Sequence, residues 1–117
     1  MKLAYKIWLD YNGRAFGSGP ARLLDGVERT GSLRKAAAEL GMSYNKAWRI
    51  LHAAEQRLGF PVLERSVGGT LGGGSALTPR GLDLVTRYRA LQSEAEVVLR
   101  EVFDRHFGDW VDPAEKG

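Results

Sequence analysis

The stretch SLRKAAAELGMSYNKAWRILHAAEQRL, residues 32–58, holds two helical patterns separated by a very short turn. In residues 32–40 the apolar positions recur at the 0, 3, 4, 7 spacing of one buried helix face, and Ser32 can cap the free backbone N–H groups at its start. Gly41 can end this helix in a left-handed conformation, and a second capped helix follows over residues 43–58. Two capped helices joined by a short turn that contains glycine predict a helix-turn-helix motif.

The second of these helices, which begins at Ser43, has one apolar and one polar face. Its inward stripe consists of Ala47, Ile50, Leu51, Ala54 and Leu58. Its outward positions are Tyr44, Asn45, Lys46, Trp48, Arg49 and His52. We expect Trp48 to pack between helices, because a bare exposed indole is unusual.

The polar face carries side chains that suit a DNA major groove. Arg49 can make two bonds to guanine, Asn45 can pair with adenine, and Lys46 can bond to a base or a phosphate. The first turn of a recognition helix is where such contacts usually lie. These residues alone are equally compatible with a polar face that only remains hydrated, so the neighbouring segments have to decide.

The segment after this helix, residues 61–78, predicts a wing. A short strand candidate over residues 61–65 is followed by five glycines in the eight residues 68–75, and residues 76–78 can return as a second strand. The glycines do not form a nucleotide-binding P-loop, because that motif needs a Gly-Lys-Ser/Thr sequence and no lysine lies between residues 47 and 115.

The N-terminal region predicts a β-hairpin over residues 3–17 and a helix over residues 20–30. Apolar side chains alternate along residues 3–10, and Asn12-Gly13 is a strong signal for a tight turn between two strands. Pro20 suits the first turn of the following helix, and Gly31 can end that helix.

A long helix is predicted over residues 79–107, capped by Thr78. Its apolar residues recur at alternating steps of four and three, the spacing at which two helices pack at a shallow angle. This seam consists of Leu84, Tyr88, Leu91, Ala95, Val98 and Val102. The first turns must pack on the domain itself, but beyond about Leu91 a core of this size ends, so we expect a homodimer contact. Residues 1–108 then form one domain, with a flexible tail at residues 109–117.

The composition fits a small globular protein with one basic part. The net charge is +3; residues 1–79 carry 11 Lys or Arg against 6 Asp or Glu, and residues 80–117 carry 6 against 8. This asymmetry is compatible with a module that meets an anion through one half. Without cysteine or an apolar run of about 18 residues, we expect no disulfide, no membrane partner and a cytoplasmic location.

Signals for an enzyme or a metal site are weak. The pattern Ser-x-x-Lys occurs twice, at residues 32–35 and 43–46, which shows how little it means in so short a chain. The two histidines, His52 and His106, fall on different predicted helices. We therefore expect no catalysis, no metal and no cofactor.

Two longer motifs resemble known regulators. SLRKAAAELGMS, residues 32–43, resembles the helix-turn-helix of LysR-type regulators, and LGFPVLER, residues 58–65, resembles their entry to the wing. A closer resemblance is to the N-terminal domain of ModE, the molybdate-responsive regulators. It is carried by residues 30–32, 42–44 and 47–48, by the two glycine blocks of the wing, and by Leu77, Thr78 and Gly81.

Residues and resemblance together predict a mainly α fold with small β elements: a winged helix-turn-helix with a long dimerisation helix. The N-terminal hairpin comes from the residue pattern alone and departs from the family, in which a helix is expected at this place. The resemblance implies a bacterial regulator of molybdate-linked genes that binds double-stranded DNA as a homodimer. The DNA-facing set expected from residues and resemblance together is Ser32, Arg34, Ser43, Tyr44, Asn45, Lys46, Arg49, Arg65, Gly69, Thr70 and Gly73. Because the family's oxyanion-binding domains follow the long helix, we expect no oxyanion effector on this chain. The alternative is a winged-helix architectural or protein-interaction module without base-specific readout.

Overall fold

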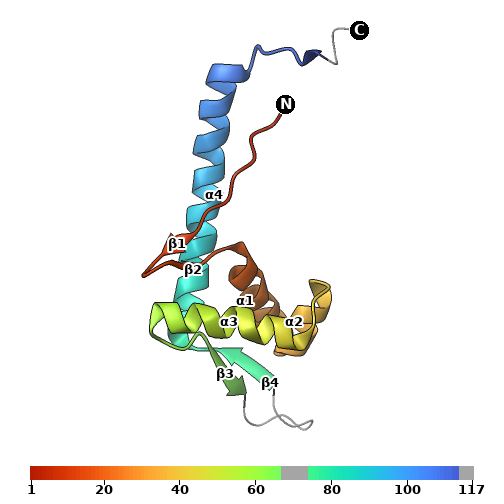
Figure 1. Ribbon diagram of the computed structural model, residues 1–117, viewed down its shortest axis with the longest axis vertical. Coiled ribbons are helices and arrows are strands. Elements are labelled where there is room, and N and C mark those ends of the chain that lie inside the picture. Colours follow the sequence, from red (N-terminus) through yellow and green to blue (C-terminus); the bar gives the residue numbers. More distant parts are fainter. Residues whose placement is uncertain (67–73, 114–117) are drawn as a thin grey trace.

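The computed structural model describes residues 1–66 and 74–113, and it is mainly helical. Its elements in chain order are β1 (Leu9–Asp10), β2 (Arg14–Phe16), α1 (Ser18–Thr30), α2 (Leu33–Glu39), α3 (Tyr44–Leu58), β3 (Leu63–Ser66), β4 (Gly74–Leu77) and α4 (Pro79–Phe107). Helices α1, α2 and α3 pack together at one end, and α4 projects away from them (Figure 1). The predicted winged helix-turn-helix with a long terminal helix is confirmed.

The caps predicted for the helix-turn-helix form as expected. The Ser32 hydroxyl accepts a hydrogen bond from the Lys35 backbone N–H at 3.1 Å, and the Ser43 hydroxyl accepts one from the Lys46 N–H at 3.1 Å. Gly41, in the turn between α2 and α3, has a φ of +68°, which a residue with a side chain rarely adopts. Glycine at this position therefore allows the chain to turn between the two helices without the strain that a side chain would bring.

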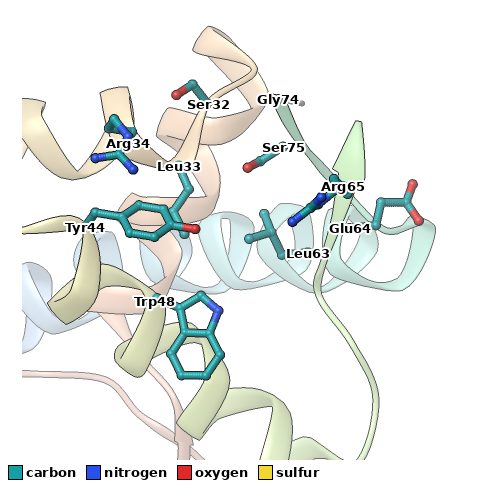
Figure 2. Close-up of a pocket in the computed structure, with 10 residues that line it drawn as sticks. All are labelled: Ser32, Leu33, Arg34, Tyr44, Trp48, Leu63, Glu64, Arg65, Gly74 and Ser75. Carbon is teal, nitrogen blue, oxygen red and sulfur yellow. The ribbon is translucent and has the colours of Figure 1, made fainter. Parts of the chain in front are cut away.

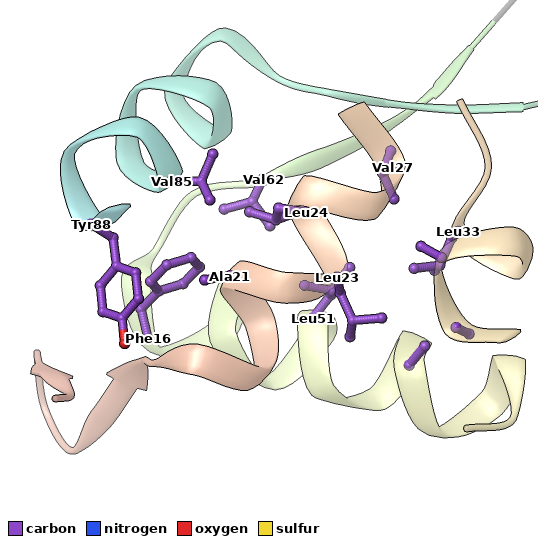
Figure 3. Close-up of a cluster of buried hydrophobic side chains, with 13 residues drawn as sticks. Phe16, Ala21, Leu23, Leu24, Val27, Leu33, Leu51, Val62, Val85 and Tyr88 are labelled. Atoms are coloured by element: carbon purple, nitrogen blue, oxygen red, sulfur yellow. The ribbon is translucent and has the colours of Figure 1, made fainter. Parts of the chain in front are cut away.

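The core lies where α1, α2, α3 and the first turns of α4 meet (Figure 3). Its largest fully buried side chains are Phe16, Leu23, Leu24, Val27, Leu33, Leu51, Val62, Val85 and Tyr88. Helices α1 and α2 approach so closely at Gly26 that a Cβ there would lie 2.6 Å from the Cβ of Ala36. The small alanines of α2 therefore set the position of the helix-turn-helix on the rest of the domain.

The wing strands β3 and β4 are antiparallel and pair from Leu63 with Leu77 to Ser66 with Gly74. The Thr78 hydroxyl fixes the junction with α4, because it donates to the Pro61 carbonyl at 2.8 Å and accepts from the Gly81 N–H at 2.9 Å. The wing is thereby attached to the base of the long helix.

The N-terminal hairpin is smaller than predicted. The Asn12-Gly13 turn is confirmed, with φ values of +58° and +112°, but β1 contains only Leu9–Asp10. Residues 1–8 form no strand; they run as an extended segment beside α4 (Figure 1). The prediction failed because alternation alone does not supply a pairing partner, and β2, with three residues, is too short to pair along this segment. Helix α1 also begins two residues before Pro20, at Ser18.

Helix α4 packs on the core through its first turns only. Gly81, Val85 and Tyr88 are buried, and no residue of α4 after Tyr88 is. The end of burial at Tyr88 agrees with the prediction that the core ends near Leu91. The predicted dimer seam is wrong at Tyr88, because this residue belongs to the core. Tyr88 is 1% exposed within the single chain, so its side chain is not available for a contact with a second copy. Within the described residues, no helix is long and apolar enough to cross a membrane.

Candidate nucleic-acid interface

The first two turns of α3 present their polar side chains to solvent. All six outward residues are exposed: Tyr44, Asn45, Lys46, Trp48, Arg49 and His52. The opposite face is anchored by Ala47, Leu51 and Ala54, which are buried. Because the first turn of α3 contains no acidic residue, the positive end of the helix is not neutralised within that turn. This face can therefore meet an anionic surface.

A hollow of about 610 Å³ lies beside this face, between α2, α3 and the wing (Figure 2). Its lining residues are Ser32, Leu33, Arg34, Tyr44, Trp48, Leu63, Glu64, Arg65, Gly74 and Ser75. The Arg34 guanidinium carbon lies 4.6 Å from the centre of the Tyr44 ring, a cation–π contact that links α2 to α3. The wing and the recognition helix thus form the two walls of one open groove.

Charges in the hollow favour an anion. In Figure 2 the Arg65 side chain points from the wing toward α3, whereas the Glu64 carboxylate points away from the hollow. Strand alternation explains the difference, because neighbouring residues of β3 project to opposite sides. The lining contains two arginines, Arg34 and Arg65, and one carboxylate, Glu64. Because that carboxylate points away, the two positive charges in the hollow are not offset by it.

Trp48 corrects a prediction. It does not pack between helices; it is 47% exposed, and its ring stacks on His52 with the centroids 4.5 Å apart and an angle of 12° between the planes. The reason is rotational: Ala47 and Leu51 occupy the core-facing side of α3, so residue 48 is turned toward the hollow. The four-residue spacing of Tyr44, Trp48 and His52 was the signal in the sequence that could have placed it there.

The predicted DNA-facing residues fall into several groups in the structure. Ser32, Arg34, Tyr44 and Arg65 line the hollow together. Asn45, Lys46 and Arg49 lie on the adjoining exposed face of α3. The hydroxyls of Ser32 and Ser43 both act as helix caps. Gly69, Thr70 and Gly73 lie outside the described residues.

Residues of the predicted dimer seam differ in accessibility. Leu91, Val98 and Val102 are exposed, with fractions of 43%, 56% and 36%. Ala95 is half-buried, and Leu84 packs partly against the core. Among the described residues, no group of three His, Cys, Asp or Glu side chains is arranged to hold a metal ion.

The family model for bacterial regulatory helix-turn-helix proteins of the lysR family matches residues 21–82, which include α2, the turn, α3 and the described wing strands. The chain belongs to this LysR-type family. The resemblance inferred from residues 32–43 and 58–65 is thereby confirmed. Sequence outside the matched range includes the N-terminal segment and most of α4.

Two relatives of the LysR-type chain carry molybdenum in their names. It is 35% identical over 114 residues to the molybdenum-pterin-binding protein MopB of Rhodobacter capsulatus, covering 97% of this chain and 41% of MopB. It is 36% identical over 93 residues to the molybdenum transport protein ModE of Azotobacter vinelandii, covering 80% of this chain and 34% of ModE. The chain thus spans about two fifths of MopB and a third of ModE.

A solved structure shows the same fold. The CbnR DBD, crystallised in a complex with DNA, superimposes with a TM-score of 0.61 at 24% identity. The similarity covers 74% of this chain and 94% of the CbnR chain. Nearly the whole of that domain therefore has its counterpart in this LysR-type chain.

Proposed function

We propose that this LysR-type chain is the DNA-binding part of a transcription regulator that recognises a specific duplex sequence. The observation that carries the proposal is the exposed donor face of α3 beside a cationic groove, with Arg49 and Asn45 outward and Arg34 and Arg65 in the hollow. Water can hydrate this polar face, but its row of donors beside the cationic groove suits an anionic partner with many acceptors. Duplex DNA presents acceptors on both its phosphates and its base edges.

In this proposal α3 enters the major groove with its N-terminal turns. Arg49 makes two hydrogen bonds to a guanine, Asn45 pairs with an adenine, and Lys46 bonds to a base or a phosphate. Arg65 and the wing meet the sugar-phosphate backbone at the flank of the site. Arg34 adds positive charge to the hollow, and its contact with Tyr44 also orients that ring at the groove wall.

The proposed regulator binds as a homodimer through α4. Leu91, Val98 and Val102 are exposed on one side of a helix that extends beyond its own core. A second copy would cover these side chains, and a two-fold dimer recognises a pseudo-palindromic site. Such a regulator acts in the cytoplasm, where bacterial DNA lies.

The genes we propose for this regulator are those of molybdate or tungstate transport, or of molybdoenzymes. Support comes from the names of MopB and ModE, relatives that match 97% and 80% of this chain. We assign no oxyanion site to the chain itself. The hollow of about 610 Å³ borders the recognition helix, so an effector there would compete with DNA.

The experiment is selection of duplexes by the purified chain from a random pool, followed by binding titrations. The enriched sequence, called the selected duplex below, is compared with a shuffled duplex of equal composition at several salt concentrations. We expect a preference of about 10³-fold or more for the selected duplex. Equal affinity for both, with the same salt dependence, would instead identify an architectural module without base readout.

A further inference from the structure

Tyr44, Trp48 and His52 form a row of aromatic side chains, four residues apart, along one side of α3, and the first two of them line the hollow. Tyr44 is 39% exposed and Trp48 is 47% exposed. The His52 ring covers one face of the indole in a nearly parallel stack. Large aromatic surface left in water is a mark of a contact site. The row therefore belongs to the proposed DNA interface, although its chemistry differs from that of the donors beside it.

The indole of Trp48 is held in place and offers mainly apolar surface. The stack on His52 restricts its rotation, and Leu63 contributes another apolar side chain to the wing side of the hollow (Figure 2). Tyr44 is less available, because the Arg34 guanidinium already lies against its ring. Trp48 is thus the residue of α3 that presents a large apolar surface to the hollow in a fixed orientation.

The edges of base pairs in the major groove offer few apolar partners. They present the acceptors N7, O6 and O4, the amino donors N6 and N4, and a single apolar substituent, the C5-methyl group of thymine. Arg49 and Asn45 suit the polar groups. An indole face gains most by covering the methyl group, since that contact removes apolar surface of both partners from water.

We propose that Trp48 is a specificity-determining residue that recognises a thymine by packing its indole on the C5-methyl group. The inference rests on the proposed function, because it requires α3 to lie in the major groove. It adds an apolar readout to the hydrogen bonds of Asn45 and Arg49. The side on which the methyl group lies gives a further signal that separates an adenine–thymine pair from a thymine–adenine pair at this position.

The test replaces each thymine of the selected duplex in turn by uracil, which lacks only the methyl group. For the wild-type chain we expect one position in each half-site at which uracil weakens binding about fourfold, the effect of exposing one methyl-sized group. In Trp48→Ala the same replacement should leave the affinity unchanged. Trp48→Phe, which keeps a smaller ring, should retain part of the discrimination.

Controls separate this effect from a general loss of structure. Trp110→Ala removes an indole that is 54% exposed and lies beyond α4, so it should keep the full fourfold effect. Because Trp48 is half exposed, its variants should unfold at nearly the wild-type urea concentration. Trp48→Gln provides a second variant, with a polar side chain that needs no burial, should the alanine variant fold poorly.

Three results would overturn the assignment. One is a wild-type chain that prefers the selected duplex yet ignores uracil at every position, which leaves the proposed function intact. Another is Trp48→Ala that keeps the thymine preference, which assigns the methyl contact to another residue, or that loses affinity equally for selected and shuffled duplexes, which indicates a backbone contact. A wild-type chain that never discriminates between duplexes removes both the proposed function and this inference.

Discussion

The Tyr88 hydroxyl donates a hydrogen bond of 2.8 Å to the backbone carbonyl of Ile7, 81 residues away in the chain. The Tyr88 ring also meets Phe16 edge to face, with the centroids 5.3 Å apart. One residue of α4 thus holds both the segment before β1 and the end of β2. Along this segment, Leu3 lines a small apolar hollow with Leu99, Val102, Phe103, His106 and Phe107.

Tyr88→Phe should lower the free energy of unfolding by about 1 kcal/mol, because it removes one hydrogen bond and keeps the ring packing. Burial raises the pKa of Tyr88 above its ordinary value. The folded chain therefore holds this proton more tightly than the unfolded chain, and the stability is lost as the pH rises above about 10. Urea titrations at pH 7 and above pH 10 should show a smaller alkaline loss in the variant. An equal loss in both proteins would contradict this assignment.

Gly26→Ala should destabilise the domain by about 1–3 kcal/mol, because the new Cβ would meet Ala36 at 2.6 Å and push α2 away from α1. Gly19→Ala is the matched control. It lies in the first turn of the same helix with nothing within 4 Å, so the helix preference of alanine should leave stability equal or higher. Thermal unfolding followed by circular dichroism measures both. Equal melting temperatures for the two variants would show that α1 and α2 separate without cost.

Asp25→Asn should stabilise the chain at pH 7 by less than about 1 kcal/mol, since the side chain is about one-third exposed. Burial raises the pKa of Asp25. The positive charge of Arg89, whose Nε lies 3.3 Å from the Asp25 Oδ1, lowers this pKa by a smaller amount. Among the described residues, the buried Oδ1 atom has no hydrogen-bond partner. A raised pKa means that stability is full while the group is protonated and falls as the pH rises through its pKa. The advantage of the variant in urea titrations should therefore disappear below about pH 4. A gain that persists at pH 3 would point to a cause other than ionisation.

Arg49→Ala should weaken binding to the selected duplex by about 1–3 kcal/mol and relax specificity at one base pair. The guanidinium is exposed on α3, and its Nε lies 3.4 Å from the Asn45 carbonyl, a weak local contact that a guanine can replace. Arg100→Ala, on the exposed far part of α4, removes the same charge and should leave base preference unchanged. If Arg49→Ala keeps the wild-type ratio between selected and shuffled duplexes, Arg49 contacts only phosphate.

Leu91→Lys should convert the proposed dimer to a monomer in sedimentation velocity experiments, because it places a charge among the exposed apolar residues of the seam. Leu82→Lys is the matched control: both leucines are 43% exposed, but nine residues along a helix place them on nearly opposite sides. The control should remain dimeric. A dimer that survives Leu91→Lys would place the interface elsewhere on the chain, and the exposed N-terminal residues Leu3 and Tyr5 offer apolar surface for it.

Local sequence signals determined the helix-turn-helix. Ser32 and Ser43 cap their helices, and Gly41 turns the chain with a positive φ. Asn12-Gly13 likewise specified its own turn. In each case the interaction that decides the conformation joins residues within a few positions of one another. Such signals are complete in the sequence, because no distant partner is needed.

Only the tertiary structure decided what each apolar side chain contacts. Periodicity placed Tyr88 on the α4 seam, but Phe16 and Ile7 bury it within its own subunit. Periodicity also set Trp48 outside the core stripe without showing that its indole borders a groove that has the wing strands as its other wall. A repeat defines the face on which a residue lies. Which element covers that face depends on contacts across tens of residues, and those exist only once the chain has folded.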